Sequence, residues 1–193
     1  MRVYTQAEFD ALPVEHGIRQ CPSGDYTQVK MFSEECSFGE GCSFGEECSF
    51  GRGCSFSEEC SFGRGCSFGG WCSFGGWCSF GRGCSFGGWC SFGEGCSFGE
   101  GCNLEGVELL GPSVLSAGGL GRENRTTYGI PHAGGVRVRC GCWAGELDEF
   151  RARVSEVHGD SPIGKEYQLM ADLFELRGQR ARMQSKESES DGP

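Results

Sequence analysis

A six-residue repeat runs without interruption from about Phe32 to Leu104, and it sets the strongest limit on how this chain folds. Its unit reads Phe-Gly-x-x-Cys-Ser. Within Cys-Ser-Phe, apolar and polar residues alternate, which predicts a short strand with Cys and Phe facing inward and Ser facing outward. The glycine-rich triplet that follows supplies the backbone freedom of a corner. The repeat therefore predicts a mainly β protein built around a parallel β-helix, left-handed and three-sided, with three units per coil and about four coils.

The repeated Phe and Cys are the expected core of this β-helix. The core positions singled out are Phe38, Phe44, Phe50, Phe62, Phe68, Phe74, Cys42, Cys48, Cys54, Cys66, Cys72 and Cys78. Metal ligands, disulfides and packing are three alternatives for the cysteines, and packing is favoured because no repeat cysteine has a ligand partner at the spacing of a zinc site. We therefore expect neither a metal site nor a cofactor. The coil length also predicts that Glu46, Arg64, Arg82 and Glu100 share one column and form ion pairs.

The repeat resembles the hexapeptide motif of the left-handed β-helix superfamily, with Phe in place of the aliphatic residue and Cys at the small position. This resemblance implies a left-handed coil and a homo-oligomer, commonly a trimer. The alternative architecture is the right-handed, four-sided helix of pentapeptide-repeat proteins, whose period is five residues rather than six.

A second resemblance involves both ends of the chain. The opening Glu8-Phe-Asp-Ala-Leu-Pro13, the stretch Arg125-Thr-Thr-Tyr128 and the segment from Gly135 to Arg151 look similar to uncharacterised hexapeptide-repeat proteins of bacteriophages and prophages. The resemblance implies a phage origin and no established chemistry.

The segments on either side of the repeat are expected to cap it. Residues 1–31 form the amino-terminal cap, with a helix near Gln6 to Leu12 and a strand around Gly17 to Val29. Residues 105–178 form an α+β domain, and residues 179–193 form a disordered tail. The strands of the α+β domain are expected at 107–110, 126–130 and 136–140. The inward residues of its two helices are expected to be Leu147, Phe150, Val154 and Val157 in the first, and Leu169, Met170, Leu173 and Phe174 in the second, which ends near Gly178.

The charge pattern argues against direct binding of nucleic acid. The net charge is −10, of which about −1 lies before Phe32, −6 in the repeat and −3 after it. The first residues have no apolar run after a basic patch, so we expect neither a secretory signal nor a membrane span and place the chain in the cytosol of a bacterial host.

Three tryptophans are the candidate binding residues. Trp71, Trp77 and Trp89 precede Cys at corners that face outward, and large exposed aromatic side chains favour a contact surface. The opposing interpretation is that each ring folds back over its own glycines. Trp71 and Trp89 are expected to stack on adjacent coils.

The resemblance to the left-handed β-helix superfamily also implies a candidate enzyme class, because enzymes of that superfamily are acyltransferases that use a histidine as general base and acetyl-CoA as donor. The repeat holds no histidine, so His132 is the one candidate base if the chain is an acyltransferase. The first hypothesis is instead a non-enzymatic phage accessory protein, a scaffold that binds a host protein or small ligand. The third is an acidic mimic of nucleic acid, suggested by the glutamates of the repeat and weakened by Arg52, Arg64 and Arg82.

Overall fold

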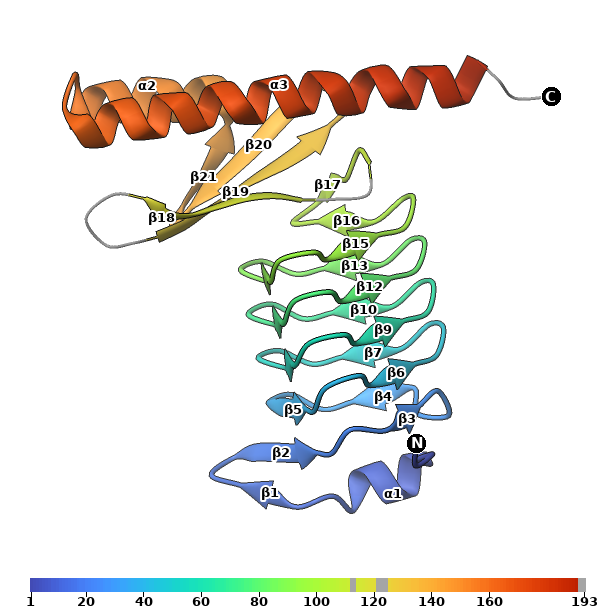
Figure 1. Cartoon of the computed structure of the whole chain (residues 1–193). Coiled ribbons are helices and arrows are strands. Elements are labelled where there is room, and N and C mark those ends of the chain that lie inside the picture. The colour runs from blue at the N-terminus through green and yellow to red at the C-terminus, as the bar shows by residue number, and fades with distance from the viewer. Residues whose placement is uncertain (112–113, 121–124, 191–193) are drawn as a thin grey trace. The chain divides into compact units, whose positions relative to one another are not determined.

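The computed structural model describes residues 1–111, 114–120 and 125–190, and it contains two compact units, Met1–Glu108 and Leu109–Pro193. The first unit is a parallel β-solenoid of stacked coils, and the second combines a small sheet with two helices (Figure 1). Among the described residues, no helix is both long and apolar enough to span a bilayer.

Three sheets make up the solenoid, and each takes every third strand of the repeat. The first sheet runs in the order β1 (Val14–Glu15), β2 (Ile18–Cys21), β5 (Cys36–Phe38), β8 (Ser55–Phe56), β11 (Ser73–Phe74) and β14 (Ser91–Phe92). The second runs β17 (Val107–Glu108), β16 (Asn103–Leu104), β13 (Ser85–Phe86), β10 (Ser67–Phe68), β7 (Ser49–Phe50) and β4 (Met31–Phe32). The third runs β15 (Ser97–Phe98), β12 (Ser79–Phe80), β9 (Ser61–Phe62), β6 (Ser43–Phe44) and β3 (Asp25–Tyr26).

The register repeats every eighteen residues, which is three six-residue units. Ser67 pairs with Ser85 and Phe68 pairs with Phe86, and the neighbouring strands of all three sheets follow the same offset through the repeat. The antiparallel strands β1 and β17 flank the stack, so each sheet keeps five parallel strands and the solenoid has about five turns.

The solenoid is one turn longer than the expected four coils because it begins before the regular repeat. Arg19 of β2 pairs with Cys36, and Asp25 of β3 pairs with Ser43, both in parallel. The first turn lacks the Cys-Ser-Phe pattern, which is why its strands were expected to belong to a cap. Ahead of it lies helix α1 (Gln6–Asp10), which begins with the predicted capping box between Thr5 and Glu8.

Phenylalanine rings fill the interior in a regular lattice. Phe74 stacks on Phe56 and Phe92 in the coils on either side, with ring centroids 4.9 and 5.2 Å apart. It also contacts the rings of the preceding and following repeat units, Phe68 and Phe80, edge-on. Both arrangements are favourable for aromatic quadrupoles. All twelve Phe and Cys side chains singled out from the sequence are buried.

Close approach of the coils explains the glycine after most of the phenylalanines. A Cβ atom added at Gly81 would lie 2.6 Å from the backbone nitrogen of Arg64, one coil below. The absence of a side chain there lets successive coils hydrogen-bond, as in the 2.9 Å bond that the Gly81 amide donates to the carbonyl of Phe62.

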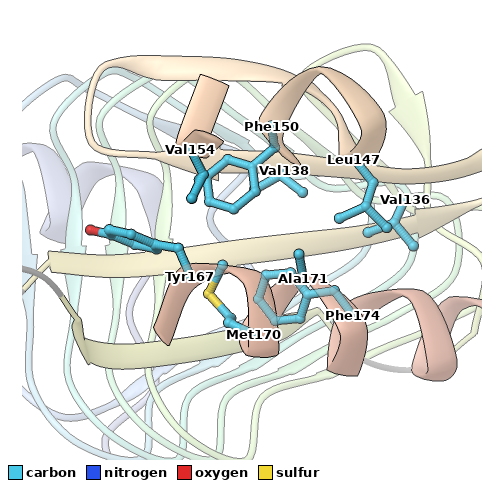
Figure 2. Close-up of a cluster of buried hydrophobic side chains, with 9 residues drawn as sticks. All are labelled: Val136, Val138, Leu147, Phe150, Val154, Tyr167, Met170, Ala171 and Phe174. Atoms are coloured by element: carbon cyan, nitrogen blue, oxygen red, sulfur yellow. The ribbon is translucent and has the colours of Figure 1, made fainter. Parts of the chain in front are cut away.

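The second unit packs two helices against a four-stranded antiparallel sheet. The sheet order is β18 (Leu115–Leu120), β19 (Arg125–His132), β20 (Gly135–Cys140) and β21 (Trp143–Glu146). Helix α2 (Leu147–His158) and helix α3 (Pro162–Ser190) follow. Figure 2 shows their shared core, which consists of Val136, Val138, Leu147, Phe150, Val154, Tyr167, Met170, Ala171 and Phe174.

The helices differ from the sequence-based expectation in which residues they bury and where they end. Val157, Leu169 and Leu173 were expected to face inward, but all three are exposed. Helix α2 buries Leu147, Phe150 and Val154 without Val157, and α3 turns Tyr167, Met170, Ala171 and Phe174 toward the sheet. The expected end at Gly178 and the disordered tail from Gln179 were also wrong, since α3 continues to Ser190. Gly178 lies within the helix, where its missing Cβ leaves room for Val136. Residues 191–193 lie outside the described part of the chain.

Candidate binding surface on the tryptophan corners

The residue before each repeat cysteine has a left-handed backbone conformation. Its φ is 66° at Trp71, 60° at Trp77 and 67° at Trp89, close to the 68° of Gly65 and Gly83 at equivalent corners. Glycine occupies this conformation without steric penalty, whereas a side chain with a Cβ costs about 1–2 kcal/mol. In the repeat, the position holds glycine, glutamate or tryptophan. The backbone conformation at this corner therefore gives no reason for an indole to be there.

Trp71 and Trp89 lie one above the other at the corners that lead from β10 to β11 and from β13 to β14. Their ring centroids are 5.6 Å apart and their planes differ by 18°. The side chains of Trp71 and Trp89 remain 61% and 38% exposed. The expected stacking on adjacent coils is therefore present, and we call this pair the Trp column.

Bare backbone and charged groups lie around the Trp column, with Arg52 in the corner of the coil below Trp71. Each ring follows two glycines, Gly69 and Gly70 before Trp71 in the lower coil, so few side chains flank it. Below the column, a Cβ added at Gly53 would lie 2.4 Å from Oε1 of Glu35, which shows that this carboxylate leans over the next coil. Above it, the amide of Trp89 donates a 3.0 Å hydrogen bond to Oε1 of Glu105.

That bond also ends the coil stack. The amide of Trp71 donates to the carbonyl of Gly88 in the coil above, at 2.9 Å. Trp89 has no regular coil above it, and the Glu105 carboxylate accepts its amide proton in place of that carbonyl. A carboxylate thus stands beside the upper tryptophan.

Trp77 belongs to a different corner, between β11 and β12. Its side chain is 65% exposed, and its ring lies over the next coil, where a Cβ at Gly95 would approach Cε3 of the indole to 2.6 Å. The three tryptophans therefore do not form one surface: two of them form the Trp column, and Trp77 lies alone on another row of corners.

The third row of corners is ion-paired. Arg64 Nε lies 2.9 Å from Glu46 Oε2, and Arg82 Nη2 lies 2.5 Å from Glu100 Oε2, each across one coil. This matches the column predicted from the eighteen-residue spacing. The pairs are exposed and contribute little stability, but they neutralise part of the acidic surface.

The repeat cysteines are free thiols, and all of them are buried except Cys96, which is half-buried. The thiol of Cys84, for example, donates a 3.3 Å hydrogen bond to the carbonyl of Gly63. Hydrogen bonding to the thiols of Cys36 and Cys72, together with burial, raises the pKa of Cys54, so its reactive thiolate form is suppressed. Among the described residues, no cluster of three His, Cys, Asp or Glu side chains is placed to hold a metal ion.

We expect thiol labelling of the native protein to modify Cys142 rapidly and the buried solenoid cysteines only on unfolding. Cys142 is the exposed cysteine, while Cys140 and Cys96 are half-buried. The measurement is the number of fast-reacting thiols with a chromogenic disulfide reagent, first in buffer and then in guanidinium chloride. Cys142→Ser is expected to remove the fastest phase. Rapid reaction of most thiols in native buffer would contradict an interior of inward-facing cysteines.

His132, the candidate general base, has both ring nitrogens engaged. Its Nδ1 accepts a 3.2 Å hydrogen bond from the amide of Gly134, and its Nε2 lies 3.0 Å from Oε2 of Glu146. A ring that accepts at Nδ1 and donates from Nε2 has no free lone pair for a substrate proton. The position of His132 on β19 is thus explained by the turn that leads into β20.

A groove of about 880 Å³ lies along α2 and α3, and its arginine is bonded to neighbouring side chains. Arg151 donates to Asp172 at 2.7 Å, to Glu175 at 2.9 Å and to Gln168 at 3.3 Å. These contacts hold the two helices together.

Comparison with known proteins adds no relative: no family model matches the chain, and no curated protein and no solved structure matches it.

Proposed function

We propose that this protein is a non-enzymatic binding scaffold whose Trp column, Trp71 and Trp89, captures a cationic segment of a partner protein. The observation that carries the proposal is the pair of exposed indoles held in a backbone conformation that favours glycine. Residues in such a conformation are held by the surrounding backbone, and they cluster at binding and active sites. Clustered exposed aromatic side chains are typical of interaction sites.

The charges around the Trp column favour a positively charged partner. Tryptophan is the best aromatic acceptor of a cation over its face, and each contact contributes about 0.5–2 kcal/mol. The repeat carries a net charge of −6, and Glu35 and Glu105 lie toward the two ends of the column, while Arg52 below Trp71 offsets one of these negative charges. Such a field attracts Lys or Arg side chains and raises their rate of encounter.

We also infer that the solenoid is a left-handed, three-sided helix of the hexapeptide type. The eighteen-residue register of the three sheets supports three sides, and the hand follows from the resemblance of the repeat. A phage accessory role in a host cytosol follows from the resemblance of the flanking segments and is part of the same proposal.

The two other functions have less support. An acyltransferase needs a free base, and both nitrogens of His132 are engaged. A mimic of nucleic acid needs an unbroken acidic surface, and the pairs of Arg64 with Glu46 and of Arg82 with Glu100 interrupt it.

The test measures binding of fluorescent peptides of equal length, one rich in Lys and Arg, one neutral and one acidic, by anisotropy. We expect the basic peptide alone to bind, and expect Trp71→Gly with Trp89→Gly to weaken it at least about tenfold because two cation–aromatic contacts are lost. The thermal midpoint of the double variant should not fall, since glycine relieves the left-handed backbone.

Trp77→Gly is the matched control, because it removes an equally exposed indole from an equivalent corner. Its affinity for the basic peptide should equal that of the parent protein. The proposal fails if no peptide binds at millimolar concentration, if the neutral or acidic peptide binds as well as the basic one, or if the control loses as much affinity as the double variant.

A further inference from the structure

Helix α3 carries a second apolar face, whose described residues are largely exposed. One face holds Tyr167, Met170, Ala171 and Phe174, buried against the sheet (Figure 2). The apolar residues on the opposite face are exposed by 48–69%, and they are Leu169, Leu173, Leu176 and Met183. We call these four residues the α3 seam.

The spacing of the α3 seam is that of a coiled coil. Successive members are separated by four, three and seven residues, and Arg180 divides the last interval into four and three. A stripe that alternates steps of three and four stays on one side of a helix and fits a second helix by interlocking side chains. A helix that only covers a sheet needs one apolar stripe, and α3 has two.

We infer that the α3 seam is a self-association surface, which pairs α3 with the α3 of a second copy of this chain in antiparallel orientation. The stripe is self-complementary, since a twofold axis at Leu176 sets Leu169 of one copy against Met183 of the other. The same alignment brings Arg180 level with Asp172 of the other copy, an opposite charge at the edge of the seam.

Arg180 decides between the two orientations. In a parallel pair, the seam would bring the Arg180 side chains of both copies into one layer, where like charges would lie together away from water. In the antiparallel pair, the aliphatic part of Arg180 covers Leu173 of the other copy, and its guanidinium reaches the rim beside Asp172. Asp172 is 63% exposed, and Arg151 of its own copy contacts its Oδ1, so Arg180 of the other copy would join this pair at the rim.

The experiment determines the mass of the full chain in solution by sedimentation velocity between about 1 and 100 µM. We expect the parent protein to self-associate and Leu173→Glu with Leu176→Glu to weaken association at least about 100-fold, because two charges would be buried in the seam. Arg180→Leu should strengthen association, since it completes the apolar stripe. Far-UV circular dichroism of each variant establishes that α3 is still folded.

The matched control is Val157→Glu, which adds the same charge at an exposed apolar position of α2 outside the seam. It should associate like the parent protein. A monomeric parent protein at 100 µM, or a folded Leu173→Glu, Leu176→Glu variant that assembles normally, would overturn the inference. Normal assembly of the folded Leu173→Glu, Leu176→Glu variant would mean that the copies associate through another surface. Both outcomes are independent of peptide binding by the Trp column.

Discussion

Phe74→Ala is expected to lower the free energy of unfolding of the solenoid by about 3–5 kcal/mol. The ring is 4% exposed, stacks between Phe56 and Phe92, and meets Phe68 and Phe80 edge-on. Its removal leaves a cavity among side chains that are fixed by backbone hydrogen bonds between coils, so the site cannot collapse to fill it. The measurement is guanidinium unfolding followed by tryptophan fluorescence in a Trp143→Phe background, where the remaining indoles all belong to the solenoid.

Trp77→Ala is the control for Phe74→Ala, since it removes a larger aromatic side chain that is mostly exposed. Its effect should stay within about 1 kcal/mol. Equal losses from the two substitutions would show that burial in the ring lattice does not determine stability. The lattice of stacked phenylalanine rings would then not be the main source of the solenoid's stability.

The regular part of the solenoid could be predicted from sequence because one local pattern is repeated under one constraint. Alternation in Cys-Ser-Phe and the glycine corner lead to a strand and a turn, and stacking of identical units then determines the register. The eighteen-residue spacing is visible in the ion pairs of Arg64 with Glu46 and of Arg82 with Glu100. The first turn, which contains Arg19 and Asp25, lacks the Cys-Ser-Phe pattern. Its backbone still pairs with the next coil, but its side chains do not indicate this pairing in the sequence.

The candidate site was predictable only in part. The exposure of Trp71, Trp77 and Trp89 and the stacking of two of them follow from the period. The left-handed backbone at these residues does not follow from the period. Glycine is the residue that indicates this conformation in a sequence, and tryptophan does not. The sequence interpretation therefore treated as one surface three indoles that lie on two rows of corners.

Helix α3 shows a different limit of sequence reasoning. Leu169 and Met170 are adjacent, as are Leu173 and Phe174, so a helical projection offers two apolar faces and cannot say which one meets the sheet. The structure selects the face of Met170 and Phe174. Shape decides this choice, because the missing side chain of Gly129 leaves space that the Phe174 ring fills.

Phe174→Ala is accordingly expected to lower the free energy of unfolding of the second unit by about 3–5 kcal/mol. Phe174 is 1% exposed, and its ring carbon Cδ2 lies 2.8 Å from where a Cβ of Gly129 would be. A loss of this size in a unit of this length lowers the thermal midpoint by more than about 10 °C. Circular dichroism at 222 nm reports the transition, since α2 and α3 supply most of the helical signal.

Val157→Ala provides the comparison for Phe174→Ala, because both positions were expected from sequence to face inward and only Phe174 does. Truncation at Val157 should change the 222 nm midpoint by no more than about 3 °C, since an exposed methyl pair removes little area from water in either state. A midpoint that falls as far for Val157→Ala as for Phe174→Ala would mean that α2 buries its Val157 face. The packing of both helices on the sheet would then differ from the arrangement described above, and the α3 seam with it.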